Sequence, residues 1–390
     1  MPVTAVLAGR IYTPQRCIEQ GCVLIKDSHI RAVGSRGEIA VPADARVYDL
    51  GDDILAPGFI DIHVHGAGGH DVMEGTREAL ARIGQTLLKH GTTAYLATTV
   101  TAPKDTTLRV LESLSAAILS AREEITGKEA LPLGIHLEGP FISLLRRGVH
   151  PAAHIQPASP EVLQEMLDAA RGEVRILTLA PEIAGAEASI RLARERGVIV
   201  ALGHSDATYE ETLHAIECGA SHAVHLFNAM RPFHHRDTGI VGAVLMHKRL
   251  TAELIADGVH VDAAALCLAL AAKGVEQLVL VTDGTSATGM PDGRYYLGTI
   301  PVTVQVGVCR TAEGKLAGSV LTLDRAVRNM LALARVDLTQ ALTMATLNPA
   351  RLLGLSAHRG VLAADAAADL VWLDSQLHVR GTFTRGYPNF

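Results

Sequence analysis

Eight short apolar runs lie between residues 54 and 284, and a stretch with helical periodicity separates most of them. The runs are ILAPGFIDIHVHG (54–66), TTAYLATTV (92–100), LPLGIHLEGP (131–140), VRILTLAPE (174–182), GVIVALGHSDA (197–207), HAVHLFNAM (222–230), LTAELIADGVH (250–260) and QLVLVTDG (277–284). In the segment after the first run, Leu80, Ile83, Leu87 and Leu88 keep the i, i+3, i+4, i+7 spacing of a helix face. Strands that are apolar throughout and alternate with helices predict an α/β fold with a (β/α)8 barrel over residues 57–356.

A doubly wound dinucleotide-binding sheet is the alternative for such an alternation. It would need a glycine-rich fingerprint after an early strand. The segment HGAGGH (65–70) lacks that spacing and places histidines where a pyrophosphate would need room. We therefore favour the barrel.

The two ends of the chain look alike and differ from the middle. The first fifty residues contain short runs such as CVLIKDSHIRAVG, broken by Gly, Pro and Asp, and the last thirty contain GVLAADAAADLVWLD and LHVRGTFTRG. This pattern is typical of antiparallel strands. We expect residues 1–56 plus 357–390 to form a small β-sandwich domain beside the barrel.

Composition excludes several classes of function. A net charge of −6, without a Lys/Arg cluster interleaved with aromatic residues, argues against a nucleic-acid partner. No apolar run reaches the roughly 18 residues that a membrane span needs. The five cysteines are scattered without a C-x-x-C pair, and the N-terminus lacks the pattern of a signal peptide, so we expect a cytoplasmic protein.

Histidines and carboxylates gather at the ends of the predicted strands, where barrel enzymes carry their active sites. On a strand, residues two apart share a face, so His63 and His65 should point together into the barrel mouth. Later runs end with Glu138, with His204, with His225 and with Asp283.

This donor set is the one that a catalytic zinc or similar divalent ion uses. Glu138, His204 and His225 would supply three ligands, and His63 with His65 could hold a second ion that shares the carboxylate. A single histidine could equally be a hydrogen-bonded core residue, and Asp283 could cap a loop or a helix. The convergence of several donors at strand ends favours a metal site, with Asp283 as the base that takes a proton from water.

A serine hydrolase triad built from His204, Ser205 and Asp206 is rejected. Adjacent residues on a strand point to opposite faces and cannot form the required relay.

Several motifs make the chain resemble the N-acetylglucosamine-6-phosphate deacetylases of the amidohydrolase superfamily. They are LAPGFIDIHVHGAGGHDVM from Leu55, HLEGPFI from His136, RGVHP from Arg147, LGHSDAT from Leu202, HLFNAMRPF from His225, IADGVHV from Ile255, VTDG from Val281, LAGSVLTLDRAVRNM from Leu316 and ATLNPARLLGL from Ala345. The resemblance covers nearly the whole chain. It implies hydrolysis of the acetamide of N-acetyl-D-glucosamine 6-phosphate to D-glucosamine 6-phosphate and acetate.

The resemblance also implies roles for individual residues. Glu138, His204 and His225 would be the main metal ligands and Asp283 the catalytic acid and base, while His150 would polarise the amide carbonyl and contact the sugar. The residues that match the family's phosphate-binding positions are Asn228, Ala229, Arg236 and His260. In the family that arginine comes from a neighbouring subunit, so a homodimer is expected. Zinc is the expected ion, one or two per subunit, although a His/Glu site also accepts iron, manganese or cobalt.

Other functions stay open from the sequence. The galactosamine epimer differs from glucosamine by one hydroxyl orientation, so N-acetylgalactosamine 6-phosphate is an alternative substrate. A cyclic amide or urea, of the dihydroorotate or hydantoin type, is a second alternative, although it would not need phosphate-binding residues. A catalytically silent scaffold is the third, and the full set of ligands with Asp283 argues against it.

Overall fold

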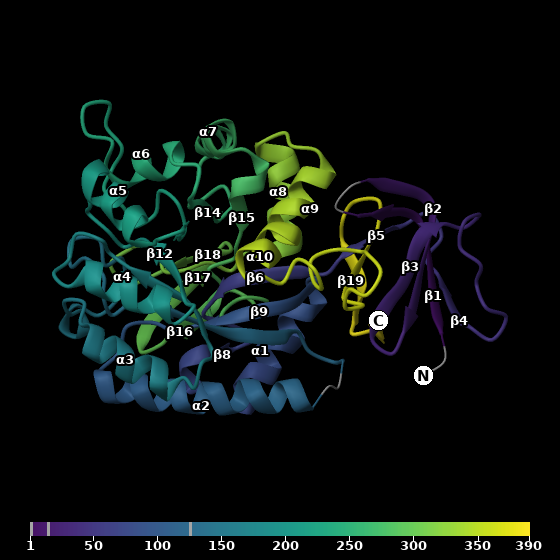
Figure 1. Cartoon of the computed structure of the whole chain (residues 1–390), viewed down its shortest axis with the longest axis horizontal. Coiled ribbons are helices and arrows are strands. Elements are labelled where there is room, and N and C mark those ends of the chain that lie inside the picture. Colours follow the sequence, from purple (N-terminus) through teal and green to yellow (C-terminus); the bar gives the residue numbers. More distant parts are fainter. Residues whose placement is uncertain (1–2, 14–15, 125–126) are drawn as a thin grey trace.

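The centre of the molecule is a sheet of eight parallel strands, which the computed structural model places in their order along the chain (Figure 1). The structure describes residues 3–13, 16–124 and 127–390, and the count refers to these. The strands are β6 (Phe59–Val64), β9 (Thr92–Thr98), β10 (Leu131–Glu138), β11 (Val174–Leu179), β12 (Ile199–Leu202), β13 (His222–Ala223), β14 (Thr251–Leu254) and β15 (Leu278–Leu280). Each apolar run contains one of them, and β6 and β9 are buried along their whole length. The predicted barrel is confirmed.

The barrel closes where the chain after β15 meets β6. The N–H of Asp283 donates to the carbonyl of His63 at 3.0 Å, and the N–H of His65 donates to the carbonyl of Gly284 at 2.8 Å. These bonds place the first and the last strand ends side by side. Closure therefore brings Asp283 next to the histidine pair.

Asp61 explains why a carboxylate precedes those histidines. It is fully buried, accepts a hydrogen bond from the hydroxyl of Thr282 at 2.7 Å, and accepts a second from the N–H of His63 at 3.3 Å. Burial raises the pKa of Asp61 to about 7, and the hydrogen bonds oppose that rise. Asp61 thus fastens β6 to the segment that follows β15, and we find it a structural residue of the barrel rather than part of the cavity.

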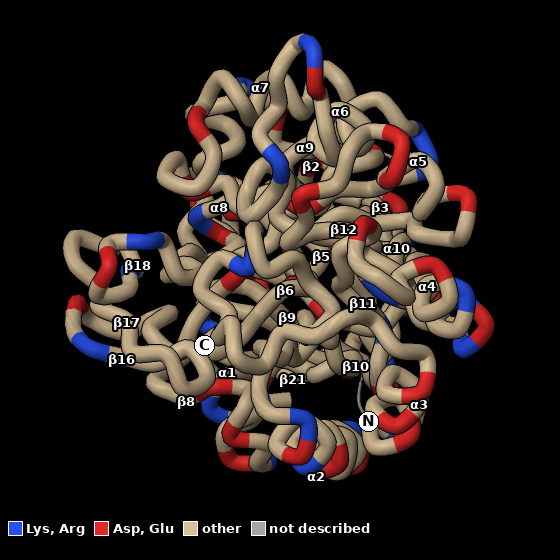
Figure 2. The backbone as a smooth tube through the Cα atoms, turned by 90° about the vertical axis from the view of Figure 1, so that its left-hand side faces the viewer, with Lys and Arg blue, Asp and Glu red and all other residues tan. Residues whose placement is uncertain are grey.

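Helices cover the outside of the barrel and form a ring around its strands in Figure 2. They are α1 (Arg77–Lys89), α2 (Lys104–Glu123), α3 (Pro160–Ala169), α4 (Ala186–Glu195), α5 (Tyr209–Cys218), α6 (Gly239–Met246), α7 (Ala263–Lys273), α8 (Leu323–Leu333), α9 (Leu338–Ala345) and α10 (Leu347–Leu352). Short 3-10 helices are η1 (Val72–Glu74), η2 (Ala152–His154) and η3 (Val275–Gln277).

The helix after the first barrel strand forms as its sequence predicts. Thr76 caps α1 by accepting a hydrogen bond from the N–H of Ala79, and Leu80, Ile83 and Leu87 are buried. Figure 2 also shows Lys and Arg interspersed with Asp and Glu on the visible side. No helix in the described part of the chain is both long enough and apolar enough to cross a membrane.

The two ends of the chain form one connected sheet at the right of Figure 1. Its strands are β1 (Thr4–Tyr12), β2 (Cys17–Lys26), β3 (His29–Ser35), β4 (Arg46–Asp49), β5 (Ile54–Pro57), β19 (Leu370–Leu373), β20 (Val379–Thr384) and β21 (Tyr387–Asn389). β5 pairs antiparallel with β19, so the predicted joining of the two ends is confirmed. The sheet has its own apolar core, which includes Val6, Val23 and Phe383. The domain boundaries at 1–56 plus 357–390 stay a prediction.

The first apolar run serves both units. Its first part is β5 of the small sheet and its second part is β6 of the barrel, with Gly58 between them. A Cβ at Gly58 would lie 2.2 Å from the side chain of Thr93. Glycine is therefore required where the chain passes from the small sheet into the barrel.

A feature that the sequence pattern did not indicate follows β15. It is a three-stranded antiparallel sheet of β16 (Gly293–Leu297), β17 (Ile300–Gln305) and β18 (Val308–Arg310). A small hairpin of β7 (Gly66–Ala67) and β8 (His70–Asp71) lies beside it, and Asp71 accepts a hydrogen bond from the N–H of Gly298 at 2.8 Å. This bond helps to place Leu297 at the barrel mouth.

Candidate metal centre

A cavity of about 180 Å³ opens at the C-terminal ends of the barrel strands. Its lining is His65, Glu138, Gly148, Val149, His150, His204, His225, Asn228, Ala229, His260, Asp283, Leu297, Leu316 and Gly318. His63 lies just beneath, within 3.4 Å of Glu138. The structure therefore brings together residues that are scattered over more than half of the sequence.

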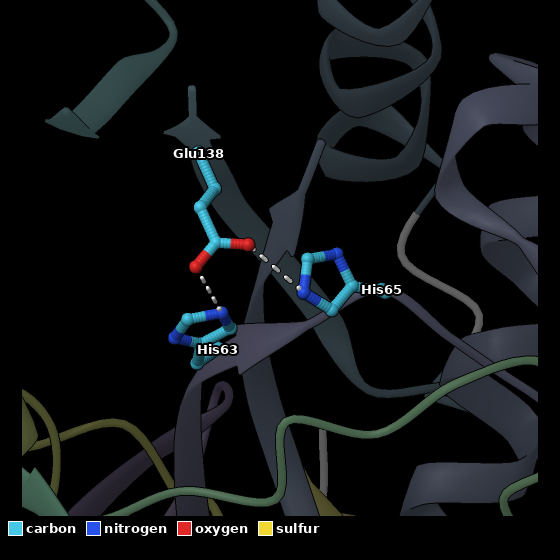
Figure 3. A group of neighbouring side chains, drawn as sticks. All are labelled: His63, His65 and Glu138. Carbon is cyan, nitrogen blue, oxygen red and sulfur yellow. Dashed lines mark ion pairs between the residues drawn. The ribbon is translucent and has the colours of Figure 1, made fainter. Parts of the chain in front are cut away.

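The carboxylate of Glu138, at the end of β10, is the centre of this group. Among the described residues, five imidazole rings approach it through their Nε2 atoms. The distances from Oε1 are 3.2 Å to His204, 3.2 Å to His225 and 3.4 Å to His63, and those from Oε2 are 3.4 Å to His65 and 3.3 Å to His150. Figure 3 shows that His63 and His65 each face a different oxygen of Glu138.

Four of the five rings have Nδ1 next to an oxygen that can only accept a hydrogen bond. The acceptors are Glu253 Oε2 at 2.8 Å for His63, the carbonyl of Thr98 at 3.2 Å for His65, that of Arg146 at 3.0 Å for His204, and that of Asn228 at 3.2 Å for His225. These partners assign the proton of each neutral ring to Nδ1. The lone pair of each Nε2 is then directed toward Glu138, the arrangement that metal-binding histidines adopt.

Two contacts in this group call for a cation. Nε2 of His63 is buried and has no hydrogen-bond partner in the described part of the chain. Nε2 of His204 lies only 3.1 Å from Nε2 of His225, so two lone pairs would face each other without a cation or a proton between them. The donor set fits a divalent ion, with two imidazole nitrogens and one carboxylate oxygen as ligands.

A second ion could share the same carboxylate. The ligand atoms of His63, His65 and Glu138 all lie within 4.8 Å of one another, and all three side chains are buried. His204 and His225 contact Oε1 of Glu138, whereas His65 contacts Oε2. This division suits a carboxylate that bridges two ions.

The protonation states favour metal binding. Burial by itself disfavours the charged carboxylate, but His63 and His204 hold the pKa of Glu138 well below its usual range. Burial lowers the pKa of His204 to about 4. Glu138 is therefore ionised and His204 neutral near pH 7, the forms that bind a metal ion.

Three of the residues at the centre have unusual backbone conformations. The φ angles are +47° at His204, +27° at His225 and +50° at Asp283. Residues other than glycine avoid this left-handed region, and they persist there only when the surrounding structure holds them. Strain at these positions is consistent with side chains directed to a functional centre.

Asp283 faces the histidines from the opposite side of the cavity to Glu138's strand. Its Oδ1 lies 3.2 Å from Nε2 of His65 and 3.7 Å from Nε2 of His63. Burial would raise the pKa of Asp283, but the hydrogen bond to His65 and nearby histidine charges lower it. An ionised carboxylate at this place could accept a proton from a water molecule in the cavity.

His150 has the opposite proton arrangement from the four rings above. Its Nδ1 accepts a hydrogen bond from the N–H of Thr101 at 3.2 Å and lies 2.8 Å from the hydroxyl of that residue. The proton of the neutral ring is therefore assigned to Nε2, which lines the cavity. His150 is suited to donate a hydrogen bond to a substrate oxygen rather than to bind a metal.

The residues expected to hold a phosphate are only partly assembled in a single chain. Asn228, Ala229 and His260 line the cavity, and Nδ1 of His260 donates to Asp257 at 2.6 Å. Arg236 is exposed and does not line this cavity, and its guanidinium contacts His235 at 3.0 Å. Its place in the loop after HLFNAM leaves it free to reach another subunit.

Sequence reasoning missed Glu253, which lies on β14 with no exposed surface. Its signal was an ionisable residue within the apolar run TAELIA. His136, which shares β10 with Glu138, is a satisfied core residue: Nδ1 donates to the carbonyl of Ile62 at 3.0 Å, and Nε2 accepts from Thr178 at 2.7 Å. Burial lowers the pKa of His136 to about 3.

A further group of possible ligands lies outside the barrel mouth, at Glu187, His214 and Cys218. Glu187 and His214 are exposed, and Glu187 already pairs with the guanidinium of Arg191 at 2.9 Å. A resident cation already neutralises this carboxylate, so this surface group does not match the barrel mouth as a metal site.

Comparison with known proteins agrees with this geometry. Residues 54–389 match the model of the amidohydrolase family. The N-acetylgalactosamine-6-phosphate deacetylase of Escherichia coli O157:H7 is 38% identical over 381 residues, which cover 97% of this chain and 97% of that protein. The N-acetylglucosamine-6-phosphate deacetylase of Bacillus subtilis (strain 168) is 36% identical over 381 residues, which cover 96% and 94%.

Solved structures give the same result. A mutant N-acetyl-D-glucosamine-6-phosphate deacetylase from Mycobacterium smegmatis, in complex with N-acetyl-D-glucosamine-6-phosphate, superposes with a TM-score of 0.92 at 37% identity. The superposition covers 100% of this chain and 99% of that one.

The assignment of protons separates ligands from core histidines and can be tested by substitution. His204→Asn removes a lone pair directed at Glu138, and we expect it to weaken zinc binding by at least about 100-fold while the metal-free protein stays folded. His136→Asn should keep zinc binding but destabilise the metal-free protein by about 2 kcal/mol, because it loses buried contacts and hydrogen bonds. Zinc titration and thermal unfolding of both variants measure the two effects. Equal loss of zinc in both would contradict the assignment.

Proposed function

The chain belongs to the amidohydrolase family, and on that basis we propose that it hydrolyses the acetamide of N-acetyl-D-glucosamine 6-phosphate to D-glucosamine 6-phosphate and acetate. The observation that carries the proposal is the composition of one cavity. It holds a metal-type donor set around Glu138, a carboxylate at Asp283, a hydrogen-bond donor at His150 and anion-binding candidates at Asn228 and His260. The named function of several relatives, and the ligand of the M. smegmatis complex, support the same substrate.

We propose zinc as the ion, held by Glu138, His204 and His225, with His63 and His65 available for a second. Iron, manganese or cobalt would suit the same donors. When bound, a divalent ion supplies a Lewis acid that polarises a carbonyl oxygen and lowers the pKa of a water molecule to about 7. Asp283 and His150 provide the remaining chemistry.

Asp283 acts as base and then as acid. Its carboxylate takes a proton from the attacking water, whose oxygen forms a bond to the acetyl carbon. The C–N bond then breaks as Asp283 returns that proton to the amide nitrogen, so that the amine leaves and acetate remains. The position of Asp283 at the closure of the barrel places it beside His65 and opposite the open part of the cavity.

His150 stabilises the negative charge that develops on the carbonyl oxygen. Its Nε2–H is already directed into the cavity because Thr101 occupies Nδ1. A donor fixed in this way lowers the barrier by about 3 kcal/mol, since it needs no reorganisation during the reaction.

The sugar phosphate would be held at the outer end of the cavity. His260 presents Nε2 there, because its Nδ1 is bound to Asp257. Asn228 and Ala229 lie on the same side, in the loop after β13. A guanidinium would complete an anion site of this type, and we propose that Arg236 supplies it from a second subunit.

We therefore propose a homodimer. The loops that carry Arg146 and Arg231 meet at Asp206, with contacts of 2.7 and 3.8 Å. Close to those arginines in the chain, Leu145 is 77% exposed and Phe233 is 54% exposed. Large apolar side chains on the surface beside a cavity are typical of a protein interface.

We further propose a cytoplasmic enzyme. The five cysteines are free thiols in the structure, which suits a reducing compartment.

The galactosamine epimer is the nearest alternative substrate, because one relative with 38% identity carries that name. Several relatives at 36–41% identity are named for the glucosamine epimer, and so is the bound ligand of the M. smegmatis complex. A cyclic amide is less consistent with His260 and Asn228 in the cavity, because a neutral ring needs no anion site. A silent scaffold would not need an assembled donor set with Asp283.

Acetate release tests the reaction and the role of Asp283 together. The zinc-loaded protein should release acetate from N-acetylglucosamine 6-phosphate faster than from N-acetylgalactosamine 6-phosphate, and it should not open a hydantoin ring. Asp283→Asn should keep the ion content and lower kcat by about 10²- to 10⁴-fold, because asparagine cannot transfer the proton.

Asp262→Asn is a matched control, since Asp262 caps α7 away from the cavity and asparagine caps helices equally well. Its turnover should equal that of the wild type. Normal turnover by Asp283→Asn would refute the acid–base role, and preference for the other epimer or for the hydantoin would assign the activity to that alternative.

A mixed dimer tests whether Arg236 acts in the neighbouring site. Arg236→Ala alone should raise KM about 10- to 100-fold through loss of a charged hydrogen bond. A heterodimer of one Arg236→Ala subunit and one Asp283→Asn subunit, purified through two different tags, should contain one complete site and show about half of the wild-type kcat at the wild-type KM. The raised KM of Arg236→Ala in the heterodimer, or a monomer in analytical ultracentrifugation, would contradict the shared site.

A further inference from the structure

Glu253 is a charged residue at a place where charge is costly. It lies on β14 with no exposed surface, and its strand neighbours Ala252 and Leu254 are apolar and buried. A buried carboxylate persists only when hydrogen bonds compensate for its lost hydration. The partners of Glu253 therefore indicate why it is there.

The side chain of Glu253 contacts two of the candidate ligands through one oxygen. Its Oε2 accepts a hydrogen bond from Nδ1–H of His63 at 2.8 Å and a second from the backbone N–H of His225 at 3.0 Å. Its other oxygen, Oε1, lies 3.2 Å from Nε2 of His222. The carboxylate lies behind the metal centre and does not line the cavity among the described residues.

The main chain of Glu253 adds to this hold. Its carbonyl accepts a hydrogen bond from the N–H of Leu226 at 2.9 Å, the residue that follows His225. His225 itself has a φ of +27°, a conformation that a histidine adopts only under constraint. Two hydrogen bonds to one residue of β14 thus fix the backbone on both sides of the strained Cα.

The effect on His63 is different. Accepting a proton from Nδ1 leaves the lone pair on Nε2, and that atom is buried 3.4 Å from Glu138 without a hydrogen-bond partner in the described part of the chain. The bond to Glu253 also stops rotation of the ring. Without it, Nδ1 would have no acceptor, and the ring could turn away from Glu138.

We propose that Glu253 is a positioning residue that fixes His63 and His225 together, and so couples the two sides of the metal centre. One oxygen holds the ring of a ligand on β6 and the backbone of a ligand after β13, on two of the approaches to Glu138. This role deepens the proposed function and rests on it in one respect, because it takes Glu138 to be a metal ligand.

The geometry distinguishes positioning from a simple effect of charge. Glutamine keeps the length of the side chain and can place its oxygen where Oε2 accepts both hydrogen bonds. Its amide N–H can then donate to His222, since the Nδ1 of that ring lies 2.7 Å from the hydroxyl of Thr251 and can carry the proton. Aspartate keeps the charge but is one methylene shorter, and it cannot reach both His63 and His225.

The test compares Glu253→Gln with Glu253→Asp in the full-length protein. Zinc affinity is measured by competition with a chromogenic chelator, without substrate. We expect Glu253→Gln to bind zinc nearly as the wild type does, and Glu253→Asp to bind it about 10- to 100-fold more weakly. In Glu253→Asp kcat should fall while KM for the sugar phosphate stays unchanged, because His260 and Asn228 are untouched.

Glu173 offers a matched control. It is also a buried glutamate, paired with Arg122 at 2.7 Å, and it precedes β11 at the other end of the barrel. Glu173→Gln and Glu173→Asp should leave zinc affinity unchanged, so a loss in either would show that any buried glutamate variant disturbs the centre and would overturn the inference.

The reverse pattern, with Glu253→Asp near wild type and Glu253→Gln impaired, would overturn the proposal in favour of charge. If Glu253→Asp did not fold, Glu253→Gln would decide alone, and a loss of zinc affinity of about tenfold or more in it would also overturn the proposal. Because zinc is measured without substrate, absence of sugar-phosphate hydrolysis in the wild type would refute the proposed reaction and not this role.

Discussion

The arrangement of the barrel mouth depends on one buried carboxylate. Glu138 is 2% exposed, and five imidazole nitrogens lie within 3.4 Å of its oxygens in the described structure. Neutral rings with their lone pairs directed at a common carboxylate would repel it and one another. A divalent cation removes that conflict, because both the carboxylate and the imidazoles become its ligands. The geometry is therefore that of a metal centre rather than of a polar core.

Each ring is held by an acceptor from a different part of the chain, and this is why the centre needs a barrel. The acceptors come from β9, from β14 and from the loops after β10 and β13. Closure of the sheet through Asp61 and Thr282 places Asp283 next to these rings. His150 differs only in the partner of its Nδ1, and that one difference changes it from a possible ligand into a hydrogen-bond donor. Proton positions set by the surrounding backbone thus divide similar side chains among different roles.

Much of this could be read from the sequence, for physical reasons. Apolar runs of strand length reveal buried parallel strands, and the barrel rule then predicts that polar residues at their ends meet. Glu253 was missed because its role depends on the register of β14 beside β13, which no local pattern specifies. His136 stands in the same strand as Glu138 but is satisfied by Ile62 and Thr178, and only the folded structure distinguishes it from a ligand. The sheet of β16–β18 was not indicated, and Arg236 acquires a site only if a second subunit is present.

The most direct test of the central claim is anomalous diffraction from crystals of the zinc-loaded protein, recorded above and below the zinc absorption edge. The account predicts a peak about 2.0–2.2 Å from an oxygen of Glu138 and from Nε2 of His204 and of His225. A second peak beside His63 and His65 would show that the carboxylate bridges two ions. An ordered, zinc-saturated crystal with no peak at Glu138 would contradict the account.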